Sequence, residues 1–186
     1  MCKALLLDSK KLKFVDVVKY LGIYIKSSKV FSISFEHVRM ASYRCFNGIY
    51  SKCKAAASET IGVHLLKAYC LPLVTYGLES LTLSVSSVRL MDGMINNALR
   101  KIFNVSDDIV VWHIRKIFGI NSIELMYHRA LVKFLLKFVR KQLSFAETML
   151  DVVFPRVQPI LCVYNISDDA SKLAQISAAL SAIDSL

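Results

Sequence analysis

The chain has 186 residues, of which 55% are hydrophobic and 20% are charged. It therefore has enough apolar side chains for a packed core, which excludes a disordered chain. Its 24 Lys and Arg against 14 Asp and Glu give a net charge of +10, which favours a polyanionic partner, nucleic acid before a membrane surface. The charge is uneven, because residues 1–143 carry 22 basic and 9 acidic side chains, whereas residues 144–186 carry 2 and 5. A solvated basic surface without a partner is the alternative.

The mean hydropathy of +0.47 is high for a free-standing soluble domain. A membrane segment or apolar surface that packs against another domain would both explain it. The longest apolar stretch, Ala68–Val85, is interrupted by Pro72, Gly77 and Glu79, so it is a poor spanning helix. We therefore expect apolar surface that a partner or a further domain covers.

The five cysteines form no CxxC pair and are odd in number, which suits a reducing compartment. The apolar patch Ala4–Leu7 is too short for the hydrophobic region of a signal peptide. We expect an intracellular protein, nuclear or cytoplasmic, that is not secreted.

Residues 1–30 predict short β-strands. Apolar and β-branched runs place them at Lys3–Leu7, Leu12–Val18 and Tyr20–Ile25, with a turn at Asp8–Lys11 between the first two. Gly22 interrupts the run FVDVVKYLGIYI, which indicates a sharp turn or the close approach of another backbone.

From Ser34 onward the apolar residues repeat at three and four, the period of amphipathic helices. Ser34 and Asn121 are candidate N-caps, Pro72 should kink its helix, and Gly119 should end another. The predicted helices cover approximately residues 34–53, 58–79, 84–103, 107–118 and 121–138, with a final helix from about 167. The predicted fold is mainly α, with short N-terminal strands or a hairpin followed by a multi-helix bundle.

The sequence shows no catalytic motif. Asp107-Asp108 and Asp168-Asp169 are the only adjacent carboxylate pairs, and both precede predicted helices, where acidic residues cap and complement the helix dipole. The four histidines share no metal-ligand spacing, and the glycines form no phosphate-binding loop. We therefore expect neither a catalytic site nor a cofactor in this chain.

Basic residues flank the apolar stripe of the first predicted helix. Arg39, Arg44, Lys52 and Lys54 lie along it, and exposed cations with interleaved tyrosines can track a phosphate backbone. A solvated face remains the alternative for the same residues.

Several stretches, taken in order, resemble the reverse transcriptases of non-LTR (LINE-type) retrotransposons. Val18–Ile23 resembles the "YLG" strand that closes their palm, and the ordered pair YCLP and YGLE within Leu65–Glu79 is similar to their thumb. The remaining similar stretches are Arg39–Asn47, Asn96–Phe103, Trp112, Arg115 and Ser122–Phe138.

The resemblance implies a palm end over residues 1–30, a helical thumb-like and downstream region over 31–143, and an acidic tail with a final helix over 144–186. It implies that Tyr20, Leu21 and Gly22 support the 3′ end of the primer, and that the basic helices hold an RNA–DNA hybrid or duplex. The family's aromatic-Ala-Asp-Asp strand is not in this sequence. The implied fragment of an RNA-directed DNA polymerase would therefore be inactive alone. Mg²⁺ would belong to the missing palm, and the palm and fingers would be partners.

Two other interpretations stay open. The first is a helical protein-interaction module with no nucleic-acid role. The second is peripheral membrane binding through Leu131–Leu143, a basic amphipathic helix whose apolar face could equally be core.

Overall fold

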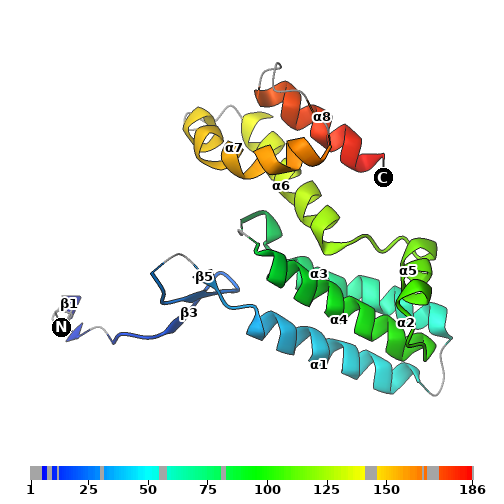
Figure 1. The fold of residues 1–186 in the computed structure, drawn as a ribbon. Helices are drawn as coiled ribbons and strands as arrows, with labels where there is room; N and C mark the ends of the chain where they lie inside the picture. The colour runs from blue at the N-terminus through cyan, green and yellow to red at the C-terminus, as the bar shows by residue number, and fades with distance from the viewer. Residues whose placement is uncertain are drawn as a thin grey trace.

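A computed structural model describes residues 6–7, 10–11, 13–29, 32–54, 58–80, 83–140, 146–164, 166 and 172–185. Short strands at the N-terminal end lead into a helical bundle, and the last helices form a second layer beside it (Figure 1). The predicted fold class, mainly α with a short N-terminal hairpin, is confirmed.

The strands form two small antiparallel sheets. In the first, β1 (Leu6–Leu7) pairs with β2 (Lys10–Lys11). In the second, the order is β3 (Val17–Tyr20), β4 (Ile23–Lys26) and β5 (Ser32–Ile33). We call β3, β4 and their turn the hairpin.

The strand boundaries differ from the predicted ones. The strand predicted over Leu12–Val18 is found at Val17–Tyr20, and the run predicted as one strand over Tyr20–Ile25 is broken by a turn at Leu21 and Gly22. Positive φ at both turn residues reverses the chain inside the run, which is the sharp turn that Gly22 indicated.

The helices follow the predicted order. Their bounds are α1 Glu36–Cys53, α2 Glu59–Leu65, the π-helical segment η1 Leu66–Cys70, α3 Leu71–Thr75, the 3₁₀ segment η2 Leu78–Ser80, α4 Val85–Phe103, α5 Asp108–Ile117, α6 Ile123–Arg140, α7 Ala146–Val163 and α8 Lys172–Asp184.

Two predicted caps are wrong. The N-cap of α1 is Phe35 without a side-chain cap bond, because the Ser34 N–H donates to the carbonyl of Tyr24 and ties that residue to β4. At α6 the hydroxyl of Ser122, rather than Asn121, accepts the Leu125 N–H. The stop at Gly119 is confirmed, since that residue has φ of 60° directly after α5.

Pro72, which was predicted to kink its helix, directly follows a break in the regular α-helical hydrogen bonding. Proline lacks an N–H and crowds the carbonyl four residues earlier, which is Ala68 here. The chain widens into a π-helical segment at that point, and the Leu71 N–H bonds to the carbonyl of Leu66, five residues back. Helix α3 then continues through the proline and ends at Thr75, short of the predicted Glu79.

The main core lies between α1, the α2–α3 segment and α4, and it extends to α5 and the start of α6. Its least exposed side chains include Val63, Met91, Leu99, Val111 and Ile123. Burial of these side chains is what holds the helices together, because each presents one apolar stripe to this core.

A second core joins α6, α7 and α8, with Leu131, Leu135, Val157 and Ile176 buried in it. The sequence predicted only a final helix in the acidic tail. The structure instead has α7, which contains Pro155 and Pro159, as well as α8. The apolar face of α6 that was considered for membrane binding is therefore covered through Leu136, and residues 141–143 lie outside the described part.

Candidate nucleic-acid interface

The turn of the hairpin has two successive left-handed residues. Leu21 has φ of 46° and Gly22 has φ of 83°, and Tyr20 pairs with Ile23 across the turn. This is the tight hairpin turn for which Asn-Gly is a preferred sequence. Left-handed backbone costs a leucine about 1 kcal/mol because its Cβ crowds the following carbonyl. The Leu21 side chain is 74% exposed, so little burial offsets that cost.

Tyr76 holds this turn against the helical bundle. Its hydroxyl donates to the carbonyl oxygen of Leu21 at 3.3 Å, and a Cβ on Gly22 would lie 3.1 Å from its ring. Gly22 thus serves both the turn and the close approach of an aromatic ring. A second contact lies on β4, where the Tyr24 ring stacks on His37 with 3.6 Å between centroids.

A hollow of about 560 Å³, which we call the hairpin groove, lies between the hairpin, α1 and α3. Two cations line it, Lys19 from β3 and Arg44 from α1, together with the carboxylate of Glu36 and the rings of Tyr24, His37 and Tyr76. The Lys19 ammonium lies 5.7 Å from the centroid of Tyr24, within cation–π range. In such a groove the cations can contact phosphates, and the aromatic rings can stack on bases.

Of the residues predicted to contact nucleic acid, Gly22 and Arg44 line the hairpin groove. Tyr20 and Leu21 lie at the turn with exposed side chains. Lys19 was not among the predicted residues, although it adjoins them in sequence. Its position in the groove depends on the hairpin turn, because the turn pairs β3 with β4 and so holds β3 near the start of α1.

The other predicted cations of α1 do not join the groove. Arg39 forms an ion pair of 2.7 Å with Glu36, and the hydrogen bond and charge of Glu36 raise the pKa of Arg39. Lys52 and Lys54 lie at or just beyond the far end of the helix, with the Lys54 ammonium 5.9 Å from the ring of Tyr50. The helical repeat of about 3.6 residues per turn spreads these cations around α1 rather than along one stripe.

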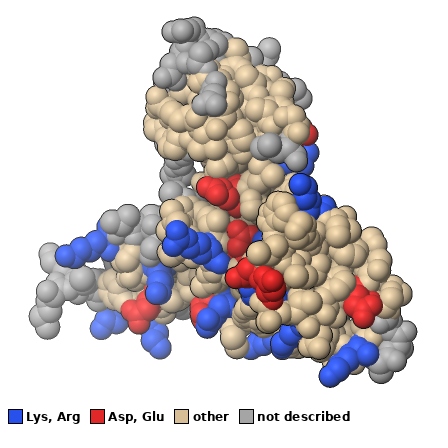
Figure 2. Space-filling view, turned by 45° about the vertical axis from the view of Figure 1, so that its right-hand side comes forward, with Lys and Arg blue, Asp and Glu red and all other residues tan. Residues whose placement is uncertain are grey.

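Lys and Arg side chains gather over the hairpin and along the lower edge of the helical body, and Asp and Glu side chains lie among them toward the centre of the view (Figure 2). The end of α1 carries a second cluster, where Lys54 lies over Tyr50 and Lys101 of α4 lies 6.0 Å from the ring of Phe46. Phe46 and Tyr50 stack on each other, so their rings support both lysines.

The adjacent carboxylates Asp107 and Asp108 act at the start of α5. Asp107 caps the helix by accepting the Ile109 N–H at 2.8 Å, as predicted, and Asp108 pairs with Arg100. Asp168 and Asp169 lie outside the described residues. Among the residues that the structure describes, no group of three or more His, Cys, Asp and Glu side chains is placed to hold a metal ion.

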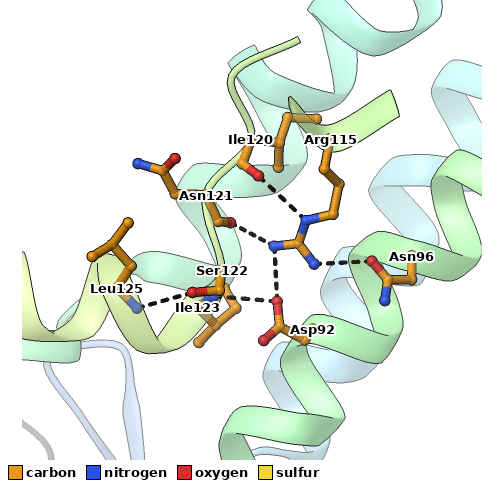
Figure 3. A network of polar contacts seen from close by, with 8 residues as sticks. All are labelled: Asp92, Asn96, Arg115, Ile120, Asn121, Ser122, Ile123 and Leu125. Carbon is orange, nitrogen blue, oxygen red and sulfur yellow. Dashed lines mark hydrogen bonds and ion pairs between the residues drawn. The ribbon is translucent and has the colours of Figure 1, made fainter. Parts of the chain in front are cut away.

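Arg115 of α5 joins three helices through a polar network (Figure 3). Its guanidinium forms a 2.9 Å ion pair with Asp92 and donates to the side-chain oxygen of Asn96, both on α4, and to the carbonyls of Ile120 and Asn121. Asp92 also accepts the N–H of Ile123, the first residue of α6, at 3.2 Å. This network fixes the path from α5 to α6. Sequence periodicity gives no signal for it.

Two cysteines of the main core lie in contact. The Sγ atoms of Cys45 on α1 and Cys70 on η1 are 3.4 Å apart, and burial raises the pKa of Cys70 to about 12. A thiol that resists ionisation is a weak nucleophile, so Cys70 acts as apolar packing at neutral pH.

Comparison with known proteins finds no relative: no protein-family model, no curated protein and no solved structure matches the chain significantly. Within the described residues, no helix is both long enough and apolar enough to cross a lipid bilayer.

Proposed function

We propose that this chain binds duplex nucleic acid or an RNA–DNA hybrid through the hairpin groove, as the palm-end and thumb part of a polymerase similar to non-LTR reverse transcriptases. The observation that carries the proposal is the groove itself. In it the YLG turn, held by Tyr76, lies beside a hollow lined by Lys19, Arg44 and aromatic rings. The net charge of +10 supplies the long-range attraction for a phosphate backbone.

The conformation of Leu21 supports a contact role for the turn. An exposed leucine is held at φ of 46°, where asparagine or glycine would cost less. Backbone strain of this kind is concentrated at functional sites, because selection for contact outweighs the loss of stability. We assign the exposed side chains of Tyr20 and Leu21 to contact with the sugar–phosphate surface.

The proposed activity is binding without catalysis. The sequence has no aromatic-Ala-Asp-Asp strand, and the helix α5 carboxylates Asp107 and Asp108 are engaged in capping and an ion pair. Catalytic carboxylates and their Mg²⁺ would therefore come from another part of the parent polymerase, in a nuclear or cytoplasmic setting.

A helical protein-interaction module is the second candidate. It is favoured by exposed apolar side chains at and before the hairpin, including Phe14 at 62%, Val15 at 52% and Val18 at 48% exposure. Such a patch fits packing against further protein. On the first proposal the same patch would meet the rest of the palm, so it does not separate the two candidates.

Fluorescence anisotropy with a short labelled RNA–DNA hybrid, titrated over a range of salt concentrations, tests the proposal. We expect Lys19→Gln and Arg44→Gln each to weaken binding and to reduce the slope of log K against log salt by about 0.9 for each phosphate that the variant no longer neutralises. Lys137→Gln on α6 is the matched control, since it removes one exposed charge that does not line the groove.

Because the proposed interaction is with phosphates, duplex DNA of another sequence should bind within a few-fold of the hybrid. Absence of binding at low salt would leave the interaction module as the better candidate. Equal effects of the groove variants and of Lys137→Gln would show that the affinity comes from net charge alone, and the groove assignment would then be wrong.

A further inference from the structure

Helix α5 presents apolar side chains on two sides. Val111 and Ile114 are buried in the main core, whereas Ile109 is 66%, Trp112 56% and Ile117 78% exposed. An exposed tryptophan between two exposed isoleucines is unusual on a surface helix. Trp is also the residue most enriched at the energetic centres of protein interfaces.

The exposed residues form two rows at spacings of four, so the members of each row are neighbours on the helix surface. The first row is Asp108, Trp112 and Lys116, and the second is Ile109, His113 and Ile117. When the helix is read in the opposite direction, Lys116 takes the place of Asp108 in the first row. In the second row an isoleucine still stands at each end. The face is therefore complementary to itself in the antiparallel direction.

We propose that α5 pairs with α5 of a second copy of this chain, antiparallel across a two-fold axis near Trp112 and His113. A two-fold interface uses the same patch on both copies, so each contact occurs twice. The pairing sets Ile109 against the partner's Ile117, and Asp108 beside the partner's Lys116. Antiparallel helices bring the same flank of each helix together, which is why the acid and the base of one row can meet.

The surroundings of the first row fit this arrangement. A hollow of about 670 Å³ is lined by Asp108, Trp112 and Lys116 and by Asn96 and Asn121 behind them, which leaves room for the partner's indole. The Lys116 ammonium already lies 5.0 Å from the ring of Trp112 and would stay close to both indoles.

Asp108 remains available for the intermolecular contact. Its pairing with Arg100 leaves the carboxylate side chain 83% exposed, so a second cation can approach it. One helix face is a small contact area, which predicts a weak, transient dimer rather than an obligate one. The occupant is a second copy because the charge pattern complements itself, whereas a polyanion would be repelled by Asp107 and Asp108 at one end of the face.

Charge reversal on the full chain tests the pairing by sedimentation equilibrium over increasing concentration. We expect the mass to rise above 21.0 kDa for the native chain. Lys116→Glu and Asp108→Lys, each alone, should weaken association by about tenfold, since each creates two like-charge contacts per dimer. An equimolar mixture of the two variants restores both contacts and should associate as well as the native chain. Lys137→Glu is the control and should not change association.

Trp112 is the only tryptophan in the chain, so its emission reports this face directly. Dimerisation should shift the emission to the blue as concentration rises. In each charge variant the shift should need about tenfold higher concentration, and in the mixture it should return to the concentration range of the native chain. A native chain that stays monomeric, or a mixture that fails to recover, would overturn the proposal. Quenching by single-stranded DNA without self-association would also overturn it and assign the face to nucleic acid. The hairpin-groove variants leave α5 intact, so they should dimerise normally whichever way the hybrid titration turns out.

Discussion

Replacement of Arg115 by alanine should destabilise the protein more than any surface substitution. The side chains of Arg115 and Asp92 are 12% and 24% exposed, and the guanidinium satisfies Asn96 and two carbonyls as well. Removing one partner of a largely buried pair typically costs 3 to 5 kcal/mol, because the remaining charge stays buried without compensation. Since Asp92 retains some solvent contact, we expect about 3 kcal/mol, a large fraction of an ordinary stability of about 5 to 15 kcal/mol.

Urea unfolding followed by circular dichroism measures this destabilisation as a lower midpoint at constant slope. For a chain of this length the same destabilisation corresponds to a fall in Tm of about 6 to 12 °C. Arg115→Lys keeps the charge but cannot reproduce the planar fork that reaches Asn96 and the carbonyls, so we expect it to recover only part of the stability.

The double-mutant cycle with Asp92→Asn separates the ion pair from the remaining contacts. We expect a coupling energy of about 1 to 3 kcal/mol between the two positions, which share one network. A destabilisation below about 1 kcal/mol for Arg115→Ala, or strict additivity in the cycle, would refute the conclusion that this network holds α4, α5 and α6 together.

Two further outcomes follow from single residues. Leu21→Asn should stabilise the hairpin by about 1 kcal/mol, because asparagine tolerates the left-handed conformation that Leu21 adopts at φ of 46°. Slower amide exchange in β3 and β4 would measure this gain. Unchanged exchange would contradict the conclusion that the leucine backbone is strained. His128 is buried beside Tyr164, and burial lowers its pKa below the ordinary 6.5. The unfolded chain therefore takes up the proton first, so stability should be full above about pH 6.5 and should fall as the pH drops below it. Urea midpoints at two pH values should show a smaller fall for His128→Gln than for the native chain, and an equal fall would exclude His128 as the cause.

The helical body could be predicted because its signals are local. Apolar residues at three and four mark α1, α4, α5 and α6, and Asp107 and Gly119 mark the ends of α5 through backbone preferences that do not depend on the rest of the fold. The failures have a different cause. Ser34 has a side chain that suits an N-cap, but its N–H donates to the carbonyl of Tyr24 on β4. This hydrogen bond depends on the tertiary structure and could not be predicted from the residues around Ser34.

Helix α7 was missed for a related reason. Pro155 and Pro159 oppose helix formation locally, yet Val157, Ile160 and Leu161 are buried against α6 and α8. Each internal proline costs roughly 3 kcal/mol, and burial of several large aliphatic side chains at about 1.5 to 3 kcal/mol each can offset it. Propensity alone cannot anticipate that balance, because the packing surface lies on helices elsewhere in the chain.

The candidate site likewise has one part that local sequence predicts and one part that depends on tertiary contacts. The turn at Gly22 is encoded within a few residues, and the sequence indicated it. Membership of the hairpin groove depends instead on Tyr76, more than 50 residues away in the chain, which fixes the hairpin beside α1 through the carbonyl of Leu21. Together with the stack of Tyr24 on His37, this tether places Lys19 beside Arg44 in one groove. Lys52 and Lys54 lie at the far end of α1 and stay outside it, although all four residues lie within the first third of the sequence. On the proposed function, phosphate contacts by Lys19 and Arg44 therefore depend on the two aromatic contacts that hold the hairpin against the helices, Tyr76 at the turn and Tyr24 on His37.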